Sequence, residues 1–575
     1  MLETPFVYPF FSGRQILPSR TQGEVNVITK VRPSSYQEFI QIYEQPGSDH
    51  FNFAFDVIDV KAAHHPGQTA MIHLDDRGVR REYDYRFFAR ESSRLANSLK
   101  NKGIGKGDTV MLILYRRIEF WVAMLALHKL GAVAIPSPSL LTTHDIVDRV
   151  HVAEVACMIV DESIVSRVDA ARKDCPSIRL YVQVAGDAAG EGWEGYDSLI
   201  AEGEERFPRP EGCAGGEDPL LIFFSSGTAG LPKMVEHTHS YPLGHIITGT
   251  YWHDLEPGDI HLTVADTGWG KAVWGKLYGQ WMAGAIVFVY DFRGKFSPRN
   301  LLAAMADNKV TTFCAPPTVY RFLIREDLTR YDLSALRHCT TAGELLNYSV
   351  FNAWEERVGL PIYEGYGQTE TTLQIATFTC MQPKPGSIGK PVPGWDIVIL
   401  DKDDNPCPPG VEGEICLRLD KGKPFGFMKG YLKEPSKTAA VTRDGYYRSG
   451  DKAWMDEDGY FWFMGRVDDL IKSSGYRIGP FEVESALIAH DAVVEAAVTG
   501  LPDPLRGQAV KATIVLAPGV EASDELTKEL QQHVKKMTAP YKYPRVVEYV
   551  TELPKTISGK IKRAEIRARD RERSE

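Results

Sequence analysis

Short apolar runs alternate with amphipathic stretches along the chain from about residue 80 onward. Uninterrupted apolar runs predict strands buried on both faces, as in a parallel sheet, and the stretches between them have helical spacing. The predicted strands are residues 110–114, 132–135, 157–160, 180–184, 261–265, 285–290 and 311–315. The predicted helices are residues 119–130, 145–155, 164–172, 276–282, 298–308 and 319–325. This alternation predicts a doubly wound α/β architecture, whose ligands usually bind at the carboxyl ends of the strands.

The two ends of the chain depart from this pattern. Residues 1–50 are aromatic and polar without a clear period, and we expect them to pack on the first domain as an extension. After about residue 385, Gly and Pro punctuate short alternating strands, which indicates a small β-rich subdomain. Beyond it, helical and strand patterns are mixed. We therefore expect a large N-terminal domain over residues 1–467 and a smaller, mobile α+β domain over residues 468–575.

Composition and charge narrow the class of protein. The 575 residues are 43% hydrophobic and 25% charged, which is typical of a soluble globular protein. A net charge of −10 argues against broad nucleic-acid binding, which needs a basic face. The eight cysteines form no C-x-x-C or zinc spacing, so we expect a reducing compartment. The most apolar stretch, residues 121–136, is too short and polar to span a bilayer, and the first residues lack a signal peptide's basic start. A cytoplasmic location is therefore predicted.

A loop rich in small and hydroxylated residues follows the apolar run 220–224. Glycines bring backbone N–H groups close to an anion, hydroxyls add donors, and a lysine adds positive charge, so the loop is predicted to hold a polyphosphate. The P-loop of nucleotide triphosphatases does not fit, because its lysine follows Gly and precedes Ser or Thr. An ordinary surface turn is the alternative. The loop comprises Ser225, Ser226, Gly227, Thr228, Ala229, Gly230, Leu231, Pro232 and Lys233.

Further stretches carry groups suited to a nucleotide. A carboxylate such as Glu370 is suited to Mg²⁺, and a ring such as Tyr366 is suited to stacking on a purine. Asp451 lies in a Ser-Gly-Asp turn that is suited to ribose hydroxyls, and Arg466 is suited to a phosphate. Lys560 lies on a Gly/Ser loop near the end of the chain. Taken alone, the stretch around the ring reads equally well as a polar loop, and each of the other positions reads more readily as an ordinary turn, a surface charge or part of a solvated tail. The stretch around the ring comprises Glu364, Gly365, Tyr366, Gly367, Gln368, Thr369 and Glu370.

In combination, these motifs resemble the adenylate-forming superfamily, which includes acyl-CoA synthetases, luciferase-like enzymes and the adenylation domains of peptide synthetases. They occur in the family's order across nearly the whole chain. Finer stretches resemble the medium-chain acyl-CoA synthetases in particular. The superfamily stretches are residues 225–233, 366–370, 449–451, 465–469 and 554–560, and the finer ones are residues 266–269, 315–321, 472–480 and 538–545.

The resemblance implies a two-step reaction that uses ATP, Mg²⁺ and coenzyme A. A carboxylate attacks the α-phosphate of ATP to give an acyl-adenylate, and the thiol of coenzyme A then attacks the acyl carbon. By resemblance, Lys233 holds the phosphates, Glu370 holds Mg²⁺ with Thr369 beside it, and Lys560 serves the first step. Tyr366 stacks on adenine, Asp451 and Arg466 hold the ribose side, and AMP leaves with the second step. Asp468 matches the hinge about which the C-terminal domain rotates.

The resemblance also implies the other binding residues. In acetate-specific relatives the position of Gly367 holds a Trp, so we expect a larger pocket for a branched, alicyclic, aromatic or medium-chain acid. A solvent-facing position is slightly favoured for Lys271. One coenzyme A contact is in doubt because Leu140 stands where relatives have Gln. The predicted acyl pocket comprises Trp269, Lys271, Trp274, Cys314, Gly343, Glu344 and Gly367. The predicted coenzyme A contacts are Ser474, Gly475, Tyr476, Arg477, Arg506, Lys535, Tyr543, Pro544 and Arg545.

Several alternatives stay open at this point. An adenylating enzyme with an amino-acid substrate or a non-CoA acceptor would need an acidic group for the amine, and Asp266 is the candidate. A luciferase-like activity, a non-catalytic nucleotide sensor and net ATP formation from acyl-CoA are also open. So are the acid itself, a homodimer, and the silencing of Lys560 by acylation, which would remove its charge.

Overall fold

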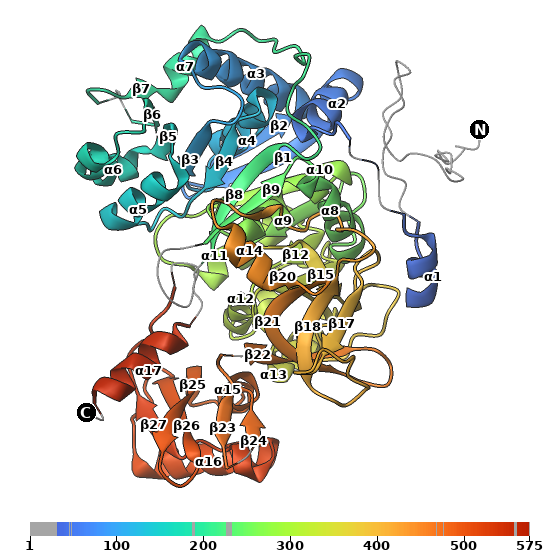
Figure 1. The fold of residues 1–575 in the computed structure, drawn as a ribbon, viewed down its shortest axis with the longest axis vertical. Helices are drawn as coiled ribbons and strands as arrows, with labels where there is room; N and C mark the ends of the chain where they lie inside the picture. The colour runs from blue at the N-terminus through green and yellow to red at the C-terminus, as the bar shows by residue number, and fades with distance from the viewer. Residues whose placement is uncertain are drawn as a thin grey trace.

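The computed structural model describes residues 31–44, 47, 49–186, 190–225, 233–466, 468–474, 476–556 and 561–573. The fold is mixed α/β, with a large N-terminal domain and a smaller C-terminal domain that lies below it in Figure 1. Among the described residues the strands form four sheets. The predicted fold class is therefore confirmed.

An eight-stranded sheet occupies the upper part of the large domain. Its order is β19 (Gly430–Tyr431), β9 (Lys233–Thr238), β8 (Pro219–Ser225), β4 (Val133–Pro136), β3 (Thr109–Ile113), β5 (Cys157–Asp161), β6 (Leu180–Val184) and β7 (Glu194–Gly195). The helices around it are α3 (Tyr85–Asn101), α4 (Ile118–Leu130), α5 (Thr143–Ala153), α6 (Val165–Ala171) and α7 (Tyr196–Glu202). Val110 and Leu112 share a core with α3 and α4, whereas Met111 and Ile113 share another with α5 and α6. Helices on both faces explain why the apolar runs are continuous here.

The most apolar stretch of the chain forms α4 and β4 inside this domain. All residues of α4 from Phe120 to Lys129 are buried. The ammonium of Lys129 is buried with partners, because Nζ donates to Asp59 Oδ1 at 2.8 Å and to Ser93 Oγ at 2.9 Å. The stretch is therefore core. Across the described residues, no helix is long and apolar enough to cross a membrane.

A nine-stranded sheet forms the centre of the large domain. Its order is β16 (Lys390–Pro391), β15 (Leu373–Ala376), β14 (Ile362–Gly367), β13 (His338–Ala342), β12 (Thr312–Cys314), β10 (Ile260–Thr263), β11 (Ile286–Asp291), β1 (Thr69–Asp75) and β2 (Arg80–Asp84). The strands from β14 to β1 run parallel, so the carboxyl ends of β10, β12, β13 and β14 meet at one edge. One face shares a core with α11 (Pro298–Asp307), α12 (Pro317–Leu323) and α13 (Tyr348–Val358). The other face shares a core with α8 (Tyr241–Ile247), α9 (Gly270–Lys276) and α10 (Tyr278–Met282).

Two smaller sheets complete the fold. The predicted β-rich subdomain is a five-stranded sheet of β17 (Ile397–Leu400), β18 (Gly413–Arg418), β21 (Tyr446–Met455), β20 (Thr442–Arg443) and β22 (Phe461–Arg466), next to α14 (Pro435–Val441). The C-terminal sheet consists of β24 (Tyr476–Ile478), β23 (Ile471–Ser473), β26 (Gly507–Leu516), β25 (Val493–Asp503) and β27 (Val546–Tyr549). One core joins this sheet to α15 (Pro480–Ile488) and α16 (Asp524–Met537), and a smaller one joins it to α17 (Arg563–Glu572).

One predicted boundary needs correction. The helix predicted over residues 276–282 is present as α10, but it begins at Tyr278, because Leu277 adopts φ −144° and ψ −83° and separates α9 from α10. The extension predicted over residues 1–50 contains α1 (Tyr36–Ile42), which is capped by Ser35. Residues 1–30, 45, 46 and 48 lie outside the described part. Phe39 of α1 is fully buried, 4.5 Å from the ring of Tyr251, so this part of the extension packs on the large domain as predicted.

Candidate active site

The loop predicted to hold phosphates connects two antiparallel strands. Ser225 ends β8 and pairs with Lys233, which begins β9. Residues 226–232 of the prediction lie outside the described part of the chain. A strand–loop–strand arrangement differs from the strand–loop–helix of a P-loop, so the exclusion of that motif agrees with the structure.

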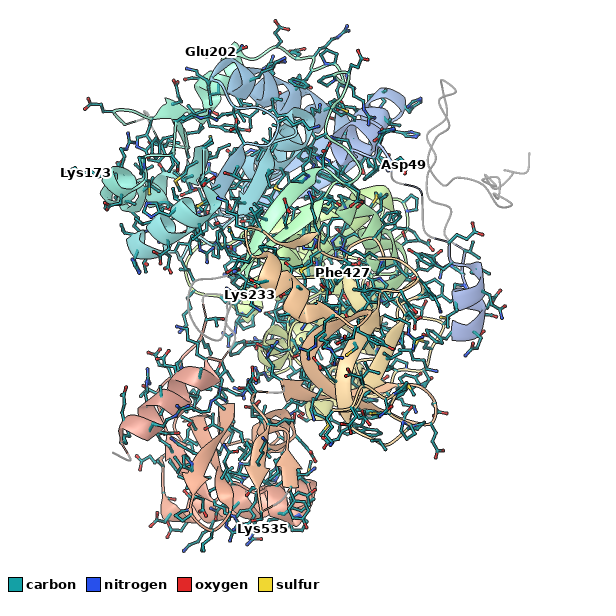
Figure 2. The ribbon with its side chains drawn as sticks, in the orientation of Figure 1. Asp49, Lys173, Glu202, Lys233, Phe427 and Lys535 are labelled. Carbon is teal, nitrogen blue, oxygen red and sulfur yellow. The ribbon has the colours of Figure 1, made fainter. Side chains whose placement is uncertain are left out.

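Lys233 and Glu370 meet at a tyrosine that the sequence analysis missed. The hydroxyl of Tyr431 donates to Glu370 Oε1 at 2.8 Å, and Lys233 Nζ lies 4.8 Å from the centre of the same ring. Thr369 is fixed nearby, because its carbonyl oxygen lies 2.8 Å from His237 Nε2. Lys233 and Glu370, which belong to motifs far apart in the sequence, thus lie in one cluster. Figure 2 labels Lys233 within the large domain.

A second cluster centres on Asp451, which is 5% exposed. Its Oδ2 accepts hydrogen bonds of 2.7 Å from the Tyr366 hydroxyl and from Gln368 Nε2. Arg466 Nη1 lies 3.5 Å from Oδ1. Tyr447, another residue missed from the sequence, donates to Gln368 Oε1 at 2.6 Å. The structure therefore brings four predicted nucleotide residues together where β14 of the nine-stranded sheet meets β21 and β22.

The side chain of Glu364, which was predicted to contact ATP, points into the protein instead. Its carboxyl group is buried, and Oε2 accepts from the backbone N–H of Leu346 at 3.2 Å. A second backbone hydrogen bond comes from Gly386. Burial outweighs both and raises the pKa of Glu364 to about 8. The side chain holds two loops together, so only its backbone remains a candidate for the nucleotide.

The predicted acyl-pocket residues gather at the carboxyl ends of the parallel strands. Cys314 ends β12, and Gly343 and Glu344 follow β13. Lys271 faces inward, because its Nζ donates to the carbonyl oxygen of Ala342 at 2.8 Å, so the favoured solvent-facing position is wrong. The carboxylate of Glu344 accepts from Thr318 Oγ1 at 2.9 Å on the more exposed side.

Trp274 occupies the space beside Gly367. A Cβ built on Gly367 would lie 2.4 Å from Cη2 of the indole, and Trp274 Nε1 donates to the Tyr241 hydroxyl at 3.2 Å. The cavity that Trp274 lines with Lys271 and Cys314 is too narrow for a water molecule in this arrangement. The pocket that Gly367 predicts therefore requires the indole to move.

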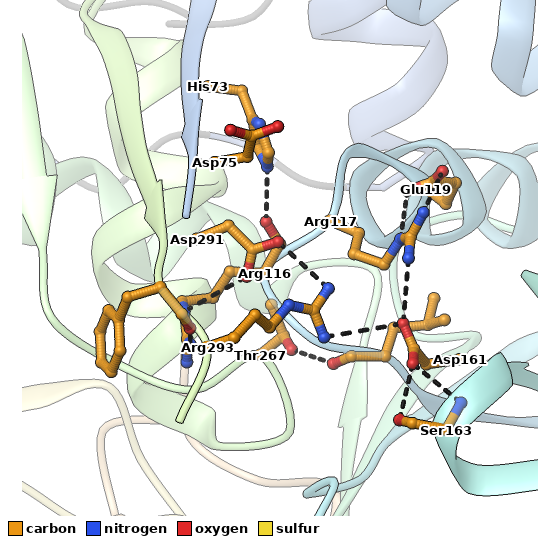
Figure 3. Close-up of polar contacts among 12 residues, drawn as sticks. His73, Asp75, Arg116, Arg117, Glu119, Asp161, Ser163, Thr267, Asp291 and Arg293 are labelled. Atoms are coloured by element: carbon orange, nitrogen blue, oxygen red, sulfur yellow. Dashed lines mark hydrogen bonds and ion pairs between the residues drawn. The ribbon is translucent and has the colours of Figure 1, made fainter. Parts of the chain in front are cut away.

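Asp266, the candidate for binding an amine, is already paired. Its Oδ1 accepts from the backbone N–H of Gly268 at 3.0 Å, and Arg116 Nη1 lies 3.7 Å from Oδ2. The same guanidinium belongs to a polar network between the two large sheets, which includes Asp291 and Arg293 (Figure 3). Asp266 thus serves to fix the loop that leads to α9.

The predicted coenzyme A contacts form two groups on the small domain. Arg506 Nη1 donates to Ser474 Oγ at 3.3 Å. Lys535 Nζ lies 4.1 Å from the ring of Tyr543, and Arg545 Nη1 donates to the Tyr543 hydroxyl at 2.6 Å. Pro544 lies between Tyr543 and Arg545 in the sequence, and its carbonyl oxygen accepts a hydrogen bond from Gln531 Nε2 of α16. Figure 2 labels Lys535 on this domain.

A further tyrosine connects these two groups. The exposed ring of Tyr476 stacks on Tyr541, with centroids 4.0 Å apart and planes 15° apart, and Tyr541 was missed from the sequence. Leu140 of the large domain is 65% exposed. Gly475 and the side chain of Arg477 lie outside the described part.

The segment after β22 is tied to the last helix. Asp469 Oδ1 accepts from Arg567 Nη1 of α17 at 2.7 Å, and Arg563 of the same helix donates to both carboxylate oxygens of Glu484 at 2.8 Å. The predicted hinge residue Asp468 is exposed. Lys560 lies outside the described residues, and α17 begins three positions after it.

The missed residues had only weak signals in the sequence. Tyr431 follows Gly430 in a stretch that reads as a turn, and Tyr447 lies just before the Ser-Gly-Asp turn. Both are aromatic residues in half-buried strands, where a packing role is the usual expectation. Their partners come from other strands, so spacing alone could not identify them.

Comparison with known proteins places these motifs in a family. A family described as "AMP-binding enzyme" matches residues 58–432, and one described as "AMP-binding enzyme C-terminal domain" matches residues 482–560. Human acyl-coenzyme A synthetase ACSM3, mitochondrial, is 41% identical over 93% of this chain and 92% of its own length. Human acyl-coenzyme A synthetase ACSM5, mitochondrial, is 43% identical over 93% of each chain.

Solved structures agree with these relatives. The anthranilate CoA ligase AuaEII in complex with anthranoyl-AMP superposes with a TM-score of 0.84 at 30% identity, over 91% of this chain and 98% of its own. A benzoate CoA ligase from Burkholderia xenovorans superposes with a TM-score of 0.77 at 26% identity, over 90% of this chain and 100% of its own.

The buried carboxyl group of Glu364 predicts a pH dependence of stability. Since its pKa is about 8 in the folded protein against 4.5 in the unfolded chain, the folded state binds more protons between these values. Its contribution to stability is therefore lost as pH rises from about 5 to 8. The variant Glu364→Gln keeps the shape of the side chain but cannot ionise. The free energy of unfolding of this variant should therefore fall less than that of the wild type between about pH 5 and pH 8. Urea unfolding at both pH values measures this, and equal losses in the two proteins would contradict it.

Proposed function

Because the chain belongs to the AMP-binding enzyme family, we propose that it is an AMP-forming acyl-CoA synthetase that activates a medium-size carboxylic acid. One observation carries the proposal most directly. The Asp451 cluster, the Lys233–Glu370 cluster and the acyl-pocket residues lie along one edge of the nine-stranded sheet, where parallel strands end. A nucleotide and an acid bound there would meet end to end.

The chemistry of the first step fits the charges along this edge. A carboxylate that approaches a polyphosphate is repelled by like charge, so the site must supply cations and donors. Lys233 and the N–H groups of the loop would bind the phosphates, and Lys560 would reach the α-phosphate. Tyr366 would stack on adenine while Asp451 accepts hydrogen bonds from the ribose. In-line attack by the acid then gives the acyl-adenylate and pyrophosphate.

Glu370 is a suitable residue for Mg²⁺. Its carboxylate is fixed by Tyr431, and an oxygen ligand held in place is what this ion prefers. When bound, the ion would neutralise charge on the phosphates. Tyr431 would keep the carboxylate oriented, and Lys233 above the same ring would add a positive charge.

The second step would use the small domain. We propose that residues 468–575 move as a unit about Asp468, which takes Lys560 out of the site and brings the groups around Tyr476 and Tyr543 to it. Basic residues at both groups, Arg506 and Lys535 among them, suit the phosphates of coenzyme A. Attack of its thiol on the acyl carbon then releases AMP.

An amino-acid substrate is the second candidate, and the structure disfavours it. The carboxylate of Asp266 already accepts from Gly268 and lies beside Arg116, so an ammonium group would have to compete with a guanidinium. The aryl-CoA ligase neighbours point instead to an aromatic acid.

The cellular location is also a proposal. We propose the cytoplasm, whereas the named relatives are mitochondrial, and cell fractionation would distinguish the two. A homodimer stays an untested prediction.

Release of pyrophosphate from ATP tests the function directly. A panel of acetate, butyrate, 2-methylbutyrate, hexanoate, benzoate and cyclohexanecarboxylate is assayed with and without coenzyme A. We expect release with the larger acids, little with acetate, and acyl-CoA only when coenzyme A is present. Turnover of amino acids alone, or of no acid, would contradict the proposal.

Trp274 should set the size of the accepted acid. Trp274→Ala removes the ring that lies beside Gly367, so we expect kcat/KM for the longest acids to rise about tenfold relative to butyrate. Trp454→Ala is the matched control, because it removes an indole that stacks on Trp462 of β22 and not one beside Gly367. This variant should leave the kcat/KM ratio unchanged. An unchanged ratio in Trp274→Ala would show that the pocket lies elsewhere.

A further inference from the structure

A histidine lies at the deep end of the predicted acyl pocket. The narrow cavity beside Trp274 is lined on its inner side by His253, which is 1% exposed. Neither the family motifs nor the predicted pocket residues include His253. The proposed reaction also leaves it without a role.

The distance of His253 from the mouth of the predicted acyl pocket can be estimated from its position along β13. Its Nδ1 lies 3.0 Å from Thr340 Oγ1, in the middle of β13, whereas Lys271 binds Ala342 at the end of the same strand. Two residues of a strand span about 7 Å. The imidazole therefore lies about that far below the edge at which the carboxylate would meet ATP. This separation matches a six-membered ring with a substituent opposite the carboxylate.

The other nitrogen of this histidine has no partner in the described part of the chain. His253 Nε2 is buried and makes no hydrogen bond there. Leaving a buried polar atom unsatisfied destabilises the folded protein, and such atoms are uncommon unless another molecule completes the bond. Burial, followed by the electrostatic effect of neighbouring His261, lowers the pKa of His253 well below its ordinary value. The ring is thus neutral, and Nε2 either donates or accepts according to its tautomer.

The backbone at this position is also unusual. Residues Thr248–Trp252 form a π-helix, and the backbone N–H of His253 closes it on Thr248 at 2.9 Å. Single π-helical turns occur frequently at functional sites, because they change the direction of the next side chain. Here the turn places Trp252 and His253 together against the cavity.

We propose that His253 is the hydrogen-bonding floor of the acyl pocket and that the preferred acid carries a hydroxyl group at the end opposite its carboxylate. This inference rests on the proposed acyl-CoA synthetase function and names its substrate class. A hydroxyl both donates and accepts, so it satisfies either tautomer of the ring. An acid of this length would have to displace the indole of Trp274 to reach the floor.

Paired acids that differ only in the hydroxyl test the inference. The pairs are 4-hydroxybenzoate with benzoate and 4-hydroxycyclohexanecarboxylate with cyclohexanecarboxylate. In the wild type we expect kcat/KM for adenylate formation to be roughly tenfold to hundredfold higher for the hydroxylated member of at least one pair. His253→Phe keeps the ring size and should bring the ratio to about one, mainly by lowering kcat/KM for the hydroxylated acid. His253→Gln retains a polar end and should keep part of the preference.

His245 provides the matched control. It is also a fully buried histidine whose ring nitrogens have no hydrogen-bond partner in the described part, but it does not line the cavity. His245→Phe should leave the ratio of the paired acids unchanged. A general effect on the core would change both variants alike and would overturn the role of His253.

The outcomes separate this inference from the function on which it rests. If the wild type has equal kcat/KM for the unsubstituted and the hydroxylated acids, the role of His253 is overturned and the synthetase function stands. If no acid of either kind releases pyrophosphate, both fail. A preference that persists in His253→Phe would place the hydroxyl elsewhere in the pocket.

Discussion

The carboxylate of Asp451 is the interaction on which the geometry of the site depends. It belongs to the five-stranded sheet, yet two of its hydrogen bonds, both 2.7 Å, come from Tyr366 and Gln368 at the end of the nine-stranded sheet. A charged acceptor that is 5% exposed needs hydrogen-bond donors, so these bonds hold the two sheets together at this point. The loop that contains Glu370 follows directly, and Tyr431 fixes it against the edge of the eight-stranded sheet. Three sheets thus meet where the proposed nucleotide would bind.

The polar groups inside the large domain divide into satisfied and unsatisfied ones. Lys129 is buried and Asp266 is partly buried, both have partners, and their roles are structural. His253 differs because one of its ring nitrogens has no hydrogen-bond partner in the described part of the chain and lies beside the pocket. Burying a polar group without a partner is unfavourable, so such a position is informative about function in a way that a paired charge is not.

The sequence predicts the fold class and seven strands of the two parallel sheets, because helices cover both faces of these sheets and make the apolar runs continuous. It also predicts four members of the Asp451 cluster, since motifs of small and charged residues mark the loops that carry them. It could not predict that Trp274 fills the space beside Gly367 or that Lys271 turns inward, because both depend on contacts between α9 and strands far away in the sequence. Tyr431 and Tyr447 were missed for the same reason. The break at Leu277 was missed because nothing in its side chain opposes a helix.

ATP binding to Asp451→Asn, measured by titration calorimetry in the absence of acid, tests the central claim most directly. Asparagine keeps the size of the side chain and loses its charge, so bonds to ribose hydroxyls worth about 1.5–3 kcal/mol should weaken and the affinity should fall roughly tenfold to hundredfold. Asp458→Asn, which changes an exposed carboxylate between β21 and β22, should bind ATP as the wild type does. An unchanged affinity in Asp451→Asn would contradict the account, because the nucleotide would then bind away from the junction of the sheets.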